Sequence, residues 1–251
     1  MITGLNTRIS NFSLLPHSLI IFAIVLLIFP TLIYAQDAPW TKVEGPWKQE
    51  LDGFFGSIAI NPNDTEVVYI GNISGGGIYK TVDGGHSWIE MNRGLPQLRF
   101  TSNYFPIRAL VIDPISPNTL YAGTCTSDPY STPGLMGRGI YKSVNAGVSW
   151  SQANSSGDHM LSGTSGTLLP IFTIRVDPKK SDTLYAGLRF GGIWKSTDGG
   201  NNWTETNNGL YEDPIRGLDI DVLAVDPVNT NIVYAAGNVT DIFQYGPISH
   251  G

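Results

Sequence analysis

The sequence predicts an all-β protein, a β-propeller of four-stranded blades with three full blades plus part of a fourth. Four segments share an alternating apolar opening that ends in Asn/Asp-Pro, at Asn61, Asp113, Asp177 and Asp226. Eight positions after each of these residues lies a tyrosine, at Tyr69, Tyr121, Tyr185 and Tyr234. Three segments then share a Gly-Ile-Tyr/Trp-Lys block, which begins at Gly77, Gly139 and Gly192. Offsets fixed at so many positions identify an internal repeat.

Each repeat reads as four short strands. The alternating opening predicts the first strand, and Asn/Asp-Pro ends it because proline cannot continue a β-ladder. The tyrosine run predicts the second strand and the Gly-Ile-Tyr/Trp-Lys block the third, after which a tight Asp-Gly-Gly turn leads into the fourth. The predicted blades span about 56–92, 107–154, 171–207 and 220–251, the last of them incomplete.

The turn before the fourth strand has the pattern Ser/Thr-x-Asp-x-Gly-x-x-Trp, which resembles the Asp-box (BNR) repeat of a family of β-propellers. In that family the Asp caps backbone N–H groups of the turn and the Trp packs beneath it. The resemblance implies structural roles for six residues, Asp83, Trp88, Asn145, Trp150, Asp198 and Trp203. The second repeat departs from the pattern with Asn145-Ala146-Gly147, so we expect a slightly weaker hairpin there.

The predicted blades do not add up to a whole number of four-stranded blades. A fourth turn of this kind is due near residue 248, so the sequence predicts only two strands in the last blade. Two interpretations stay open: the chain is the N-terminal part of a larger propeller, or the segment Trp40 to Leu51 supplies a strand that closes a four-bladed ring. As the sequence stands, an open strand edge at Val233 to Ala236 predicts possible self-association.

The first 35 residues have the pattern of a secretory signal peptide. Arg8 precedes an apolar run from Leu19 to Phe29, and Ala35 is a plausible cleavage point. We therefore expect a secreted or periplasmic protein with no membrane contact after cleavage; an uncleaved anchor is the alternative. Cys125, the single cysteine, is expected to be a small buried hydrophobe.

Composition excludes several classes of function. The formal net charge of −6, with only 15 Lys and Arg residues, argues against nucleic-acid binding. One cysteine excludes a disulfide framework, and the four histidines show no metal-ligand spacing. No Gly-x-Ser-x-Gly motif of a serine hydrolase occurs. We expect neither a metal nor a cofactor.

A binding site is expected on the face opposite the Asp-box turns. Antiparallel connectivity places the longer loops there, and loops on a rigid scaffold commonly carry function. Arginines, carboxylates and aromatic rings in these loops would suit a protein or carbohydrate ligand. The candidate ligand-binding residues are Arg99, Tyr104, Asp128, Tyr130, Arg138, Arg189, Tyr211, Glu212 and Arg216.

Resemblance to Asp-box families leaves two interpretations of function. Sialidases carry an Arg-Ile/Leu-Pro motif, which this chain lacks, and sortilin-type receptors carry a Cys-rich module that it also lacks. In xyloglucanases the first blade carries Asp-Val-Gly-Gly-x-Tyr with a catalytic Asp; here Ser74-Gly-Gly-Gly-Ile-Tyr79 lines up, so Ser74 replaces that carboxylate. Photosystem II assembly factors share the repeat spelling and need no catalytic residue. The favoured interpretation is a secreted non-catalytic binding propeller; the alternative is the N-terminal part of a xyloglucanase- or sialidase-like glycoside hydrolase.

Overall fold

A computed structural model shows an all-β architecture. It describes residues 42–43, 45, 54–98, 103–125, 137–153, 169–210, 218–237 and 243–245. The chain divides into two compact units, Met1–Lys42 and Val43–Gly251, and every strand belongs to the second unit. No helix long and apolar enough to cross a membrane is present among the described residues. The predicted signal peptide, residues 1–35, and nearly all of the segment Trp40 to Leu51 lie outside them.

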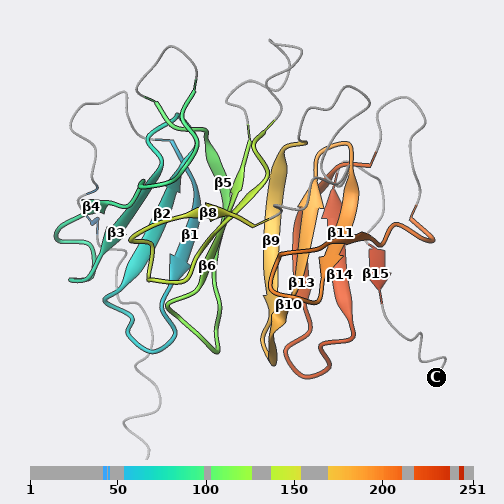
Figure 1. Ribbon diagram of the computed structural model, residues 1–251. Helices are drawn as coiled ribbons and strands as arrows, with labels where there is room; N and C mark the ends of the chain where they lie inside the picture. The colour runs from blue at the N-terminus through green and yellow to red at the C-terminus, as the bar shows by residue number, and fades with distance from the viewer. Residues whose placement is uncertain are drawn as a thin grey trace, which may run out of the picture. The chain divides into compact units, whose positions relative to one another are not determined.

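The strands form four antiparallel sheets in chain order, three with four strands and one with three (Figure 1). Blade 1 consists of β1 (Phe55–Ile60), β2 (Val68–Asn72), β3 (Ile78–Thr81) and β4 (Ile89–Glu90). Blade 2 consists of β5 (Ile107–Ile112), β6 (Leu120–Thr124), β7 (Ile140–Ser143) and β8 (Ser151–Gln152). Blade 3 consists of β9 (Ile171–Asp177), β10 (Lys180–Leu188), β11 (Gly192–Ser196) and β12 (Thr204–Glu205). Blade 4 consists of β13 (Ile220–Val225), β14 (Val233–Gly237) and β15 (Phe243–Tyr245).

The first turn of each blade is closed by the Asn or Asp that ends the repeated opening. Asp113 Oδ1 accepts the N–H groups of Ile115 and Ser116 at 2.9 and 3.1 Å. Asn61, Asp177 and Asp226 accept backbone N–H groups in the same way. Such a side chain satisfies donors that the proline-interrupted ladder leaves unpaired, so this part of the prediction is confirmed.

The fourth blade differs from the prediction in one respect. We expected two strands there, but β15 pairs with β14 in the register Val233–Tyr245 and Ala235–Phe243. The prediction of an open edge at Val233 to Ala236 is therefore wrong, because β15 is hydrogen-bonded to that edge of β14. The sequence lacked a recognisable signal, since residues 243–245 do not carry the Gly-Ile-Tyr/Trp-Lys spelling of the other third strands.

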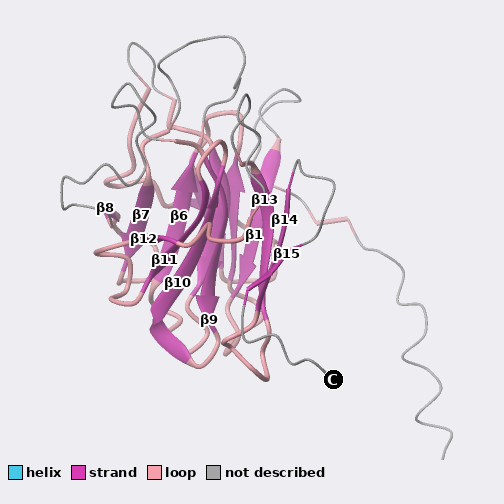
Figure 2. Ribbon diagram, turned by 90° about the vertical axis from the view of Figure 1, so that its right-hand side faces the viewer, coloured by secondary structure: helices cyan, strands magenta, loops and turns pink. Residues whose placement is uncertain are grey.

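Within the second unit the blades pack side by side through their faces. The first strands of consecutive blades are neighbours: β1 contacts β5, β5 contacts β9, and β9 contacts β13, whereas β13 makes no comparable contact with β1. Figure 2 shows the strands of successive blades layered behind one another. Buried apolar side chains fill the spaces between blades, as in the cluster of Tyr121, Ile174 and Trp203 from blades 2 and 3.

In the second strands of blades 1 and 2, a tyrosine and a glycine contact the next blade. The Tyr69 hydroxyl of blade 1 donates to the Ala146 carbonyl in the turn of blade 2 at 3.0 Å. The Tyr121 hydroxyl of blade 2 donates to the Gly199 carbonyl in the turn of blade 3 at 3.1 Å. Two residues after Tyr121, a Cβ at Gly123 would approach Ile171 of the next blade to 2.5 Å. The tyrosine and the glycine of the repeat are therefore features of the interface between blades.

Candidate functional site

The turn at Asp83 is held by side chains that point inward to its own backbone. Asp83 Oδ1 accepts the Thr81 hydroxyl at 2.7 Å and the Ser87 N–H at 2.9 Å, while Oδ2 accepts the Ser87 hydroxyl at 2.6 Å. The Thr81 hydroxyl in turn accepts the Gly85 N–H at 2.9 Å. Both oxygens of the carboxylate are thus engaged within the turn.

The turns of blades 2 and 3 repeat this geometry. Asn145 Oδ1 accepts the Ser143 hydroxyl and the Ser149 N–H, both at 2.9 Å, and its amide nitrogen donates to the Ser149 hydroxyl. Asp198 accepts the Ser196 hydroxyl at 2.9 Å and two N–H groups of Asn202. The amide of Asn145 therefore bonds the same groups of its turn as the Asp83 carboxylate does. The strain in blade 2 lies instead at Ala146, whose φ of 55° is uncommon for a residue with a Cβ.

These contacts also fix the charge of the aspartates. Hydrogen bonds from Ser87 and Thr81 hold the pKa of Asp83 below its usual range. Partial burial opposes the shift at Asp198, but hydrogen bonds from Asn202 and Ser196 lower the pKa of this carboxyl as well. A carboxylate that stays ionised and accepts bonds from its own turn is a structural cap and a poor general acid.

The three tryptophans of these turns lie beneath them. Trp150 and Trp203 are buried and Trp88 is half-buried. The indole N–H groups of Trp88 and Trp203 donate to carbonyls of their own turns, at Gly85 and Gly200. The indole of Trp150 instead reaches the preceding blade.

On the opposite face the structure describes three of the candidate ligand-binding residues. Tyr104 is half-buried; its N–H donates to the Gly75 carbonyl at 2.8 Å, and its ring packs against the core of blades 1 and 2. Arg138 is exposed, with its guanidinium 5.4 Å from the centre of the Phe105 ring. Arg189 is buried against the Phe190 ring at 4.7 Å. Only Arg138 among these three presents its side chain to solvent. The other candidates lie outside the described residues: Arg99, Asp128, Tyr130, Tyr211, Glu212 and Arg216.

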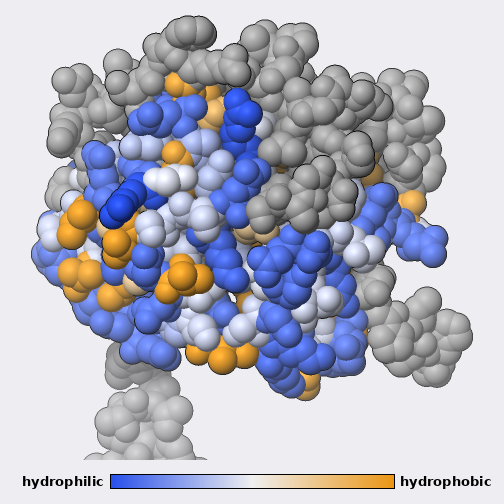
Figure 3. Space-filling model, viewed as in Figure 1, coloured by the Kyte–Doolittle hydropathy of each residue, from blue (hydrophilic) through white to orange (hydrophobic). Residues whose placement is uncertain are grey.

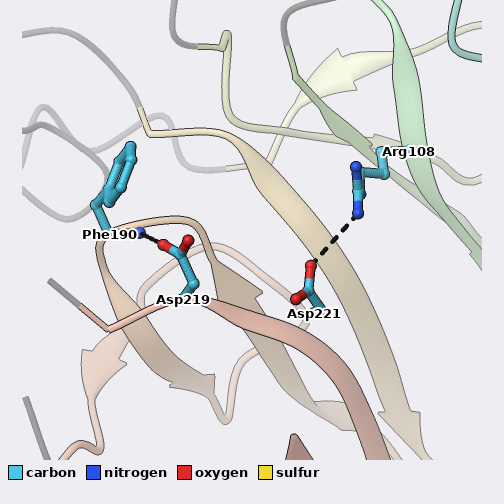
Figure 4. A network of polar contacts seen from close by, with 4 residues as sticks. All are labelled: Arg108, Phe190, Asp219 and Asp221. Carbon is cyan, nitrogen blue, oxygen red and sulfur yellow. Dashed lines mark hydrogen bonds and ion pairs between the residues drawn. The ribbon is translucent and has the colours of Figure 1, made fainter. Parts of the chain in front are cut away.

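A cluster that the loop-based prediction missed lies at the same end of the first strands. Arg108, Phe172 and Asp221 occupy the second positions of β5, β9 and β13. The Arg108 guanidinium stacks on the Phe172 ring at 3.9 Å. It also pairs with the Asp221 carboxylate at 3.3 Å (Figure 4). Side chains from three consecutive blades thus meet, and both charged partners remain about two-fifths exposed, at 45% and 40%.

A signal for this cluster was present in the repeat itself. Aligned on their turns, the first strands read Gly56, Arg108, Phe172 and Asp221 at their second positions, whereas Leu110, Ile174 and Leu223 hold the fourth. The second position varies among the blades and is polar or aromatic in three of them, whereas the fourth position stays apolar. This pattern indicates a surface to which each blade contributes a different side chain.

The loop before β13 adds a second contact to this region. Asp219 accepts the Phe190 N–H at 2.7 Å, also drawn in Figure 4, and burial raises the pKa of this carboxyl despite that bond. The backbone of Phe190 has a φ of 61°, which is strained for an aromatic residue. The residue remains 38% exposed. Phe190 is thus fixed as an exposed aromatic surface by a carboxylate from the next blade.

The Ser74 turn, where the resemblance places an acid, is also on this face. Asn72 Oδ1 accepts the N–H groups of Ser74 and Gly76 at 2.6 and 3.1 Å, and the Ser74 side chain is exposed. An unassisted serine hydroxyl cannot protonate a leaving group as a carboxylic acid does. Within the described residues, no group of three or more His, Cys, Asp or Glu side chains is placed to hold a metal ion. Cys125 is buried, and burial raises its pKa to about 11, so its thiol is inert.

The fold and the turns define the class: this is an Asp-box (BNR) β-propeller. In sequence the chain is similar to xyloglucanase Xgh74A of Acetivibrio thermocellus, with 28% identity over 184 residues, or 69% of this chain and 20% of that enzyme. It is also similar to a xyloglucanase of Paenibacillus sp, with 27% identity over 206 residues, or 76% of this chain and 18% of the enzyme. The chain thus spans about a fifth of the length of these relatives. No family model matches it.

Two solved structures share the fold. An ancestral GH74 enzyme superposes with a TM-score of 0.51 at 20% identity, covering 72% of this chain and 21% of the enzyme. YCF48 bound to a D1 peptide superposes with a TM-score of 0.52 at 14% identity, covering 84% of this chain and 55% of YCF48. The chain is therefore related to the propellers of GH74 xyloglucanases and shares its blade architecture with YCF48.

Proposed function

We propose that this chain is a propeller segment of the xyloglucanase type. It binds a xyloglucan-like β-glucan at the cluster formed by Arg108, Phe172 and Asp221. The sequence similarity to xyloglucanases over about two-thirds of the chain carries this proposal. It favours the glycoside-hydrolase interpretation over a propeller of unrelated function. Secretion, which the first 35 residues predict, is part of the proposal because the substrate would be an extracellular polymer.

The side chains of this cluster suit a neutral polysaccharide as ligand. An aromatic ring offers an apolar face to the C–H groups of a sugar, and charged groups beside it can bond the hydroxyls. Arg108 and Asp221 already satisfy one another, so both are oriented without a net charge that would demand an ionic ligand. Phe190 lies on the same side of blade 3, where its strained backbone and exposed ring favour a contact surface over a packing role.

The described residues favour binding without cleavage by this segment. Hydrolysis of a glycosidic bond normally requires two carboxyl groups on either side of the bond. Ser74 stands where the xyloglucanase resemblance places one of them, and the Asp-box carboxylates are engaged in their own turns. The Asp-box aspartates and Ser74 therefore do not supply the acid and the base of a complete enzyme.

The proposal is tested by titrating the purified chain with xyloglucan oligosaccharides in a calorimeter. Arg108→Ala should weaken binding about tenfold, since it removes a charge-assisted hydrogen bond and a stacking partner. Lys180→Ala is the matched control, because Lys180 is an exposed cation at the opposite end of the blade. Equal affinity of the two variants would place the ligand elsewhere, and no binding by the unmodified chain would reject the proposal.

A second assay separates binding from catalysis. The chain and its Ser74→Asp variant are incubated with xyloglucan, and newly formed reducing ends are measured. Neither should turn over the polymer, because a single restored carboxyl supplies only half of the catalytic pair. Measurable release by either protein would show that this segment contains a complete active site.

A further inference from the structure

Phe190, in the turn between β10 and β11, combines an aromatic side chain with a strained backbone. Its φ of 61° lies in a region that residues with a Cβ rarely adopt. The equivalent position of blade 1 holds Gly75, whose φ of 101° carries no such strain. Blade 3 therefore has an aromatic residue at a place where glycine would cost less, and strain of this kind is typical of functional sites.

Exposure alone does not distinguish Phe190 from other apolar residues of this protein. Several apolar side chains lie among hydrophilic ones on the surface drawn in Figure 3. Val82, Ile115 and Val228 are more exposed than Phe190, at 53%, 53% and 81%. Single apolar residues of this kind are normal on protein surfaces and need no partner. Phe190 differs from them because its backbone is strained and because a carboxylate of the next blade holds it.

Asp219, immediately before β13, provides that carboxylate. Its Oδ1 accepts the Phe190 N–H at 2.7 Å, and in Figure 4 the Phe190 ring points away from the carboxylate. At the place of Asp219, β5 and β9 are preceded by Pro106 and Pro170 instead. Phe190 and Asp219 thus depart from the repeat together, and the second residue fixes the turn from which the first projects.

Stacked side chains connect the Phe190 ring to the cluster of Arg108, Phe172 and Asp221. The Arg189 guanidinium lies 4.7 Å from the centre of the Phe190 ring and 6.0 Å from the centre of the Phe172 ring. On Phe172 the Arg108 guanidinium stacks at 3.9 Å. Phe172 is therefore half-buried beside two guanidinium groups, whereas Phe190 is exposed. Of the two rings, Phe190 is the one that can offer a face to a ligand.

We propose that Phe190 is the residue on which a glucose unit stacks, that it makes the site selective for β-glucans, and that Asp219 is its positioning residue. This inference rests on the proposed binding of a β-glucan at Arg108, Phe172 and Asp221. The hydroxyl groups of a β-linked glucose unit are all equatorial, so its faces carry axial C–H groups, which pack well on an aromatic ring. A mannose unit has an axial 2-hydroxyl, which this contact would leave without a hydrogen bond. A turn that is already fixed saves the cost of ordering the ring when the ligand binds.

Calorimetric titration with cellohexaose and mannohexaose tests the role of the ring. Phe190→Leu keeps an apolar side chain but removes the flat ring, so it should bind cellohexaose about tenfold more weakly than the unmodified chain. Phe190→Trp is the matched control, because it keeps an aromatic face and should bind normally. The unmodified chain should prefer cellohexaose to mannohexaose, and Phe190→Leu should reduce this preference. An unmodified chain without the preference, or a Phe190→Leu variant that binds normally, would overturn the proposal.

Arg108→Ala, titrated alongside, separates this inference from the proposed function on which it rests. If Arg108→Ala weakens binding and Phe190→Leu does not, the glucan site stands and the role of Phe190 is rejected. No binding of cellohexaose or xyloglucan oligosaccharides by the unmodified chain would reject both.

The positioning role of Asp219 is tested with two substitutions of the same residue. Asp219→Ala should weaken cellohexaose binding about as much as Phe190→Leu does, because the ring loses its fixed position. Asp219→Asn should bind normally, since its amide oxygen can still accept the Phe190 N–H. In a chain that already carries Phe190→Leu, Asp219→Ala should add no further loss, because the two residues act through one contact. Additive losses would overturn the positioning role.

Thermal unfolding of Phe190→Gly separates a ligand contact from a packing role. This variant should melt at the same temperature as the unmodified chain or higher, because glycine adopts the turn without strain. It should nevertheless bind cellohexaose about tenfold more weakly, as Phe190→Leu does. A lower melting temperature with unchanged affinity would mean that the ring serves the fold alone, and would overturn the proposal.

Discussion

The indole N–H of Trp150 donates to the Met91 carbonyl at 2.8 Å, across the boundary between blades 2 and 1. A backbone bond from the Trp150 N–H to the Arg93 carbonyl runs beside it at 2.9 Å. The same repeat position in the other two complete blades bonds its own turn, so one tryptophan joins blades while its counterparts brace hairpins.

Trp150→Phe keeps most of the apolar ring but removes the N–H that joins the blades. The loss should lower the free energy of unfolding by about 1 kcal/mol, the usual net value of a hydrogen bond, measured by urea denaturation. Trp88→Phe is the control, because Trp88 is half-buried and its indole N–H donates to the Gly85 carbonyl of its own turn. An equal effect of the two changes would show that the bond to the Met91 carbonyl stabilises the protein no more than a bond within one turn.

Trp203→Ala should destabilise the protein by about 3–5 kcal/mol, the range for emptying a buried aromatic site. The side chain is 6% exposed and lies in the core between blades 2 and 3. Thermal unfolding followed by circular dichroism measures the change. An unchanged melting temperature would remove Trp203 from the set of packing residues.

Tyr121→Phe should cost about 1 kcal/mol, because it deletes the hydroxyl that reaches the Gly199 carbonyl. Burial raises the pKa of Tyr121, so its hydroxyl keeps the proton that it donates at neutral pH. Tyr141→Phe is the control, since Tyr141 is also partly buried in a core and no hydrogen bond joins its hydroxyl to another described residue. If both variants unfold alike, the hydroxyl does not couple the blades.

Ala146→Gly should stabilise the protein by about 0.5–1 kcal/mol. Ala146 has a φ of 55°, whereas the equivalent residues Gly84 and Gly199 adopt similar values without a Cβ. Differential scanning calorimetry should show a higher melting temperature for the variant. A decrease would mean that the Ala146 methyl group makes a packing contact worth more than the strain.

Acid should weaken the turns of blades 1 and 3 but not that of blade 2. The folded pKa values of Asp83 and Asp198 lie below the unfolded value, so their stabilisation is complete above about pH 4 and is lost as pH falls further. The double variant Asp83→Asn, Asp198→Asn copies the natural Asn145 turn. Its melting temperature should fall less between pH 6 and pH 3 (about the range over which an Asp titrates) than that of the unmodified chain. An identical decline in both proteins would assign the acid sensitivity to other groups.

The local part of this structure was predictable because it repeats. The turn motifs, their Asp or Asn caps and the order of strands follow from spacings of a few residues, which act within one hairpin. Candidate site residues chosen from loops fared differently: Arg189 is buried against Phe190, and Tyr104 packs into a core. Loop position alone does not reveal whether a side chain points outward.

The sequence by itself determined the repeating blade, its capped turns and the class of propeller, because each of these depends on neighbours along the chain. Only the tertiary structure shows which side chains of different blades contact one another. The stacking of Arg108 on Phe172 and its pairing with Asp221 join residues 64 and 113 positions apart, across three blades. The bond from Trp150 to Met91 spans 59 positions and two blades, and the different exposure of Ile58 and Leu110 also depends on the neighbouring blade. These differences arise because identical repeats acquire different neighbours once they are stacked.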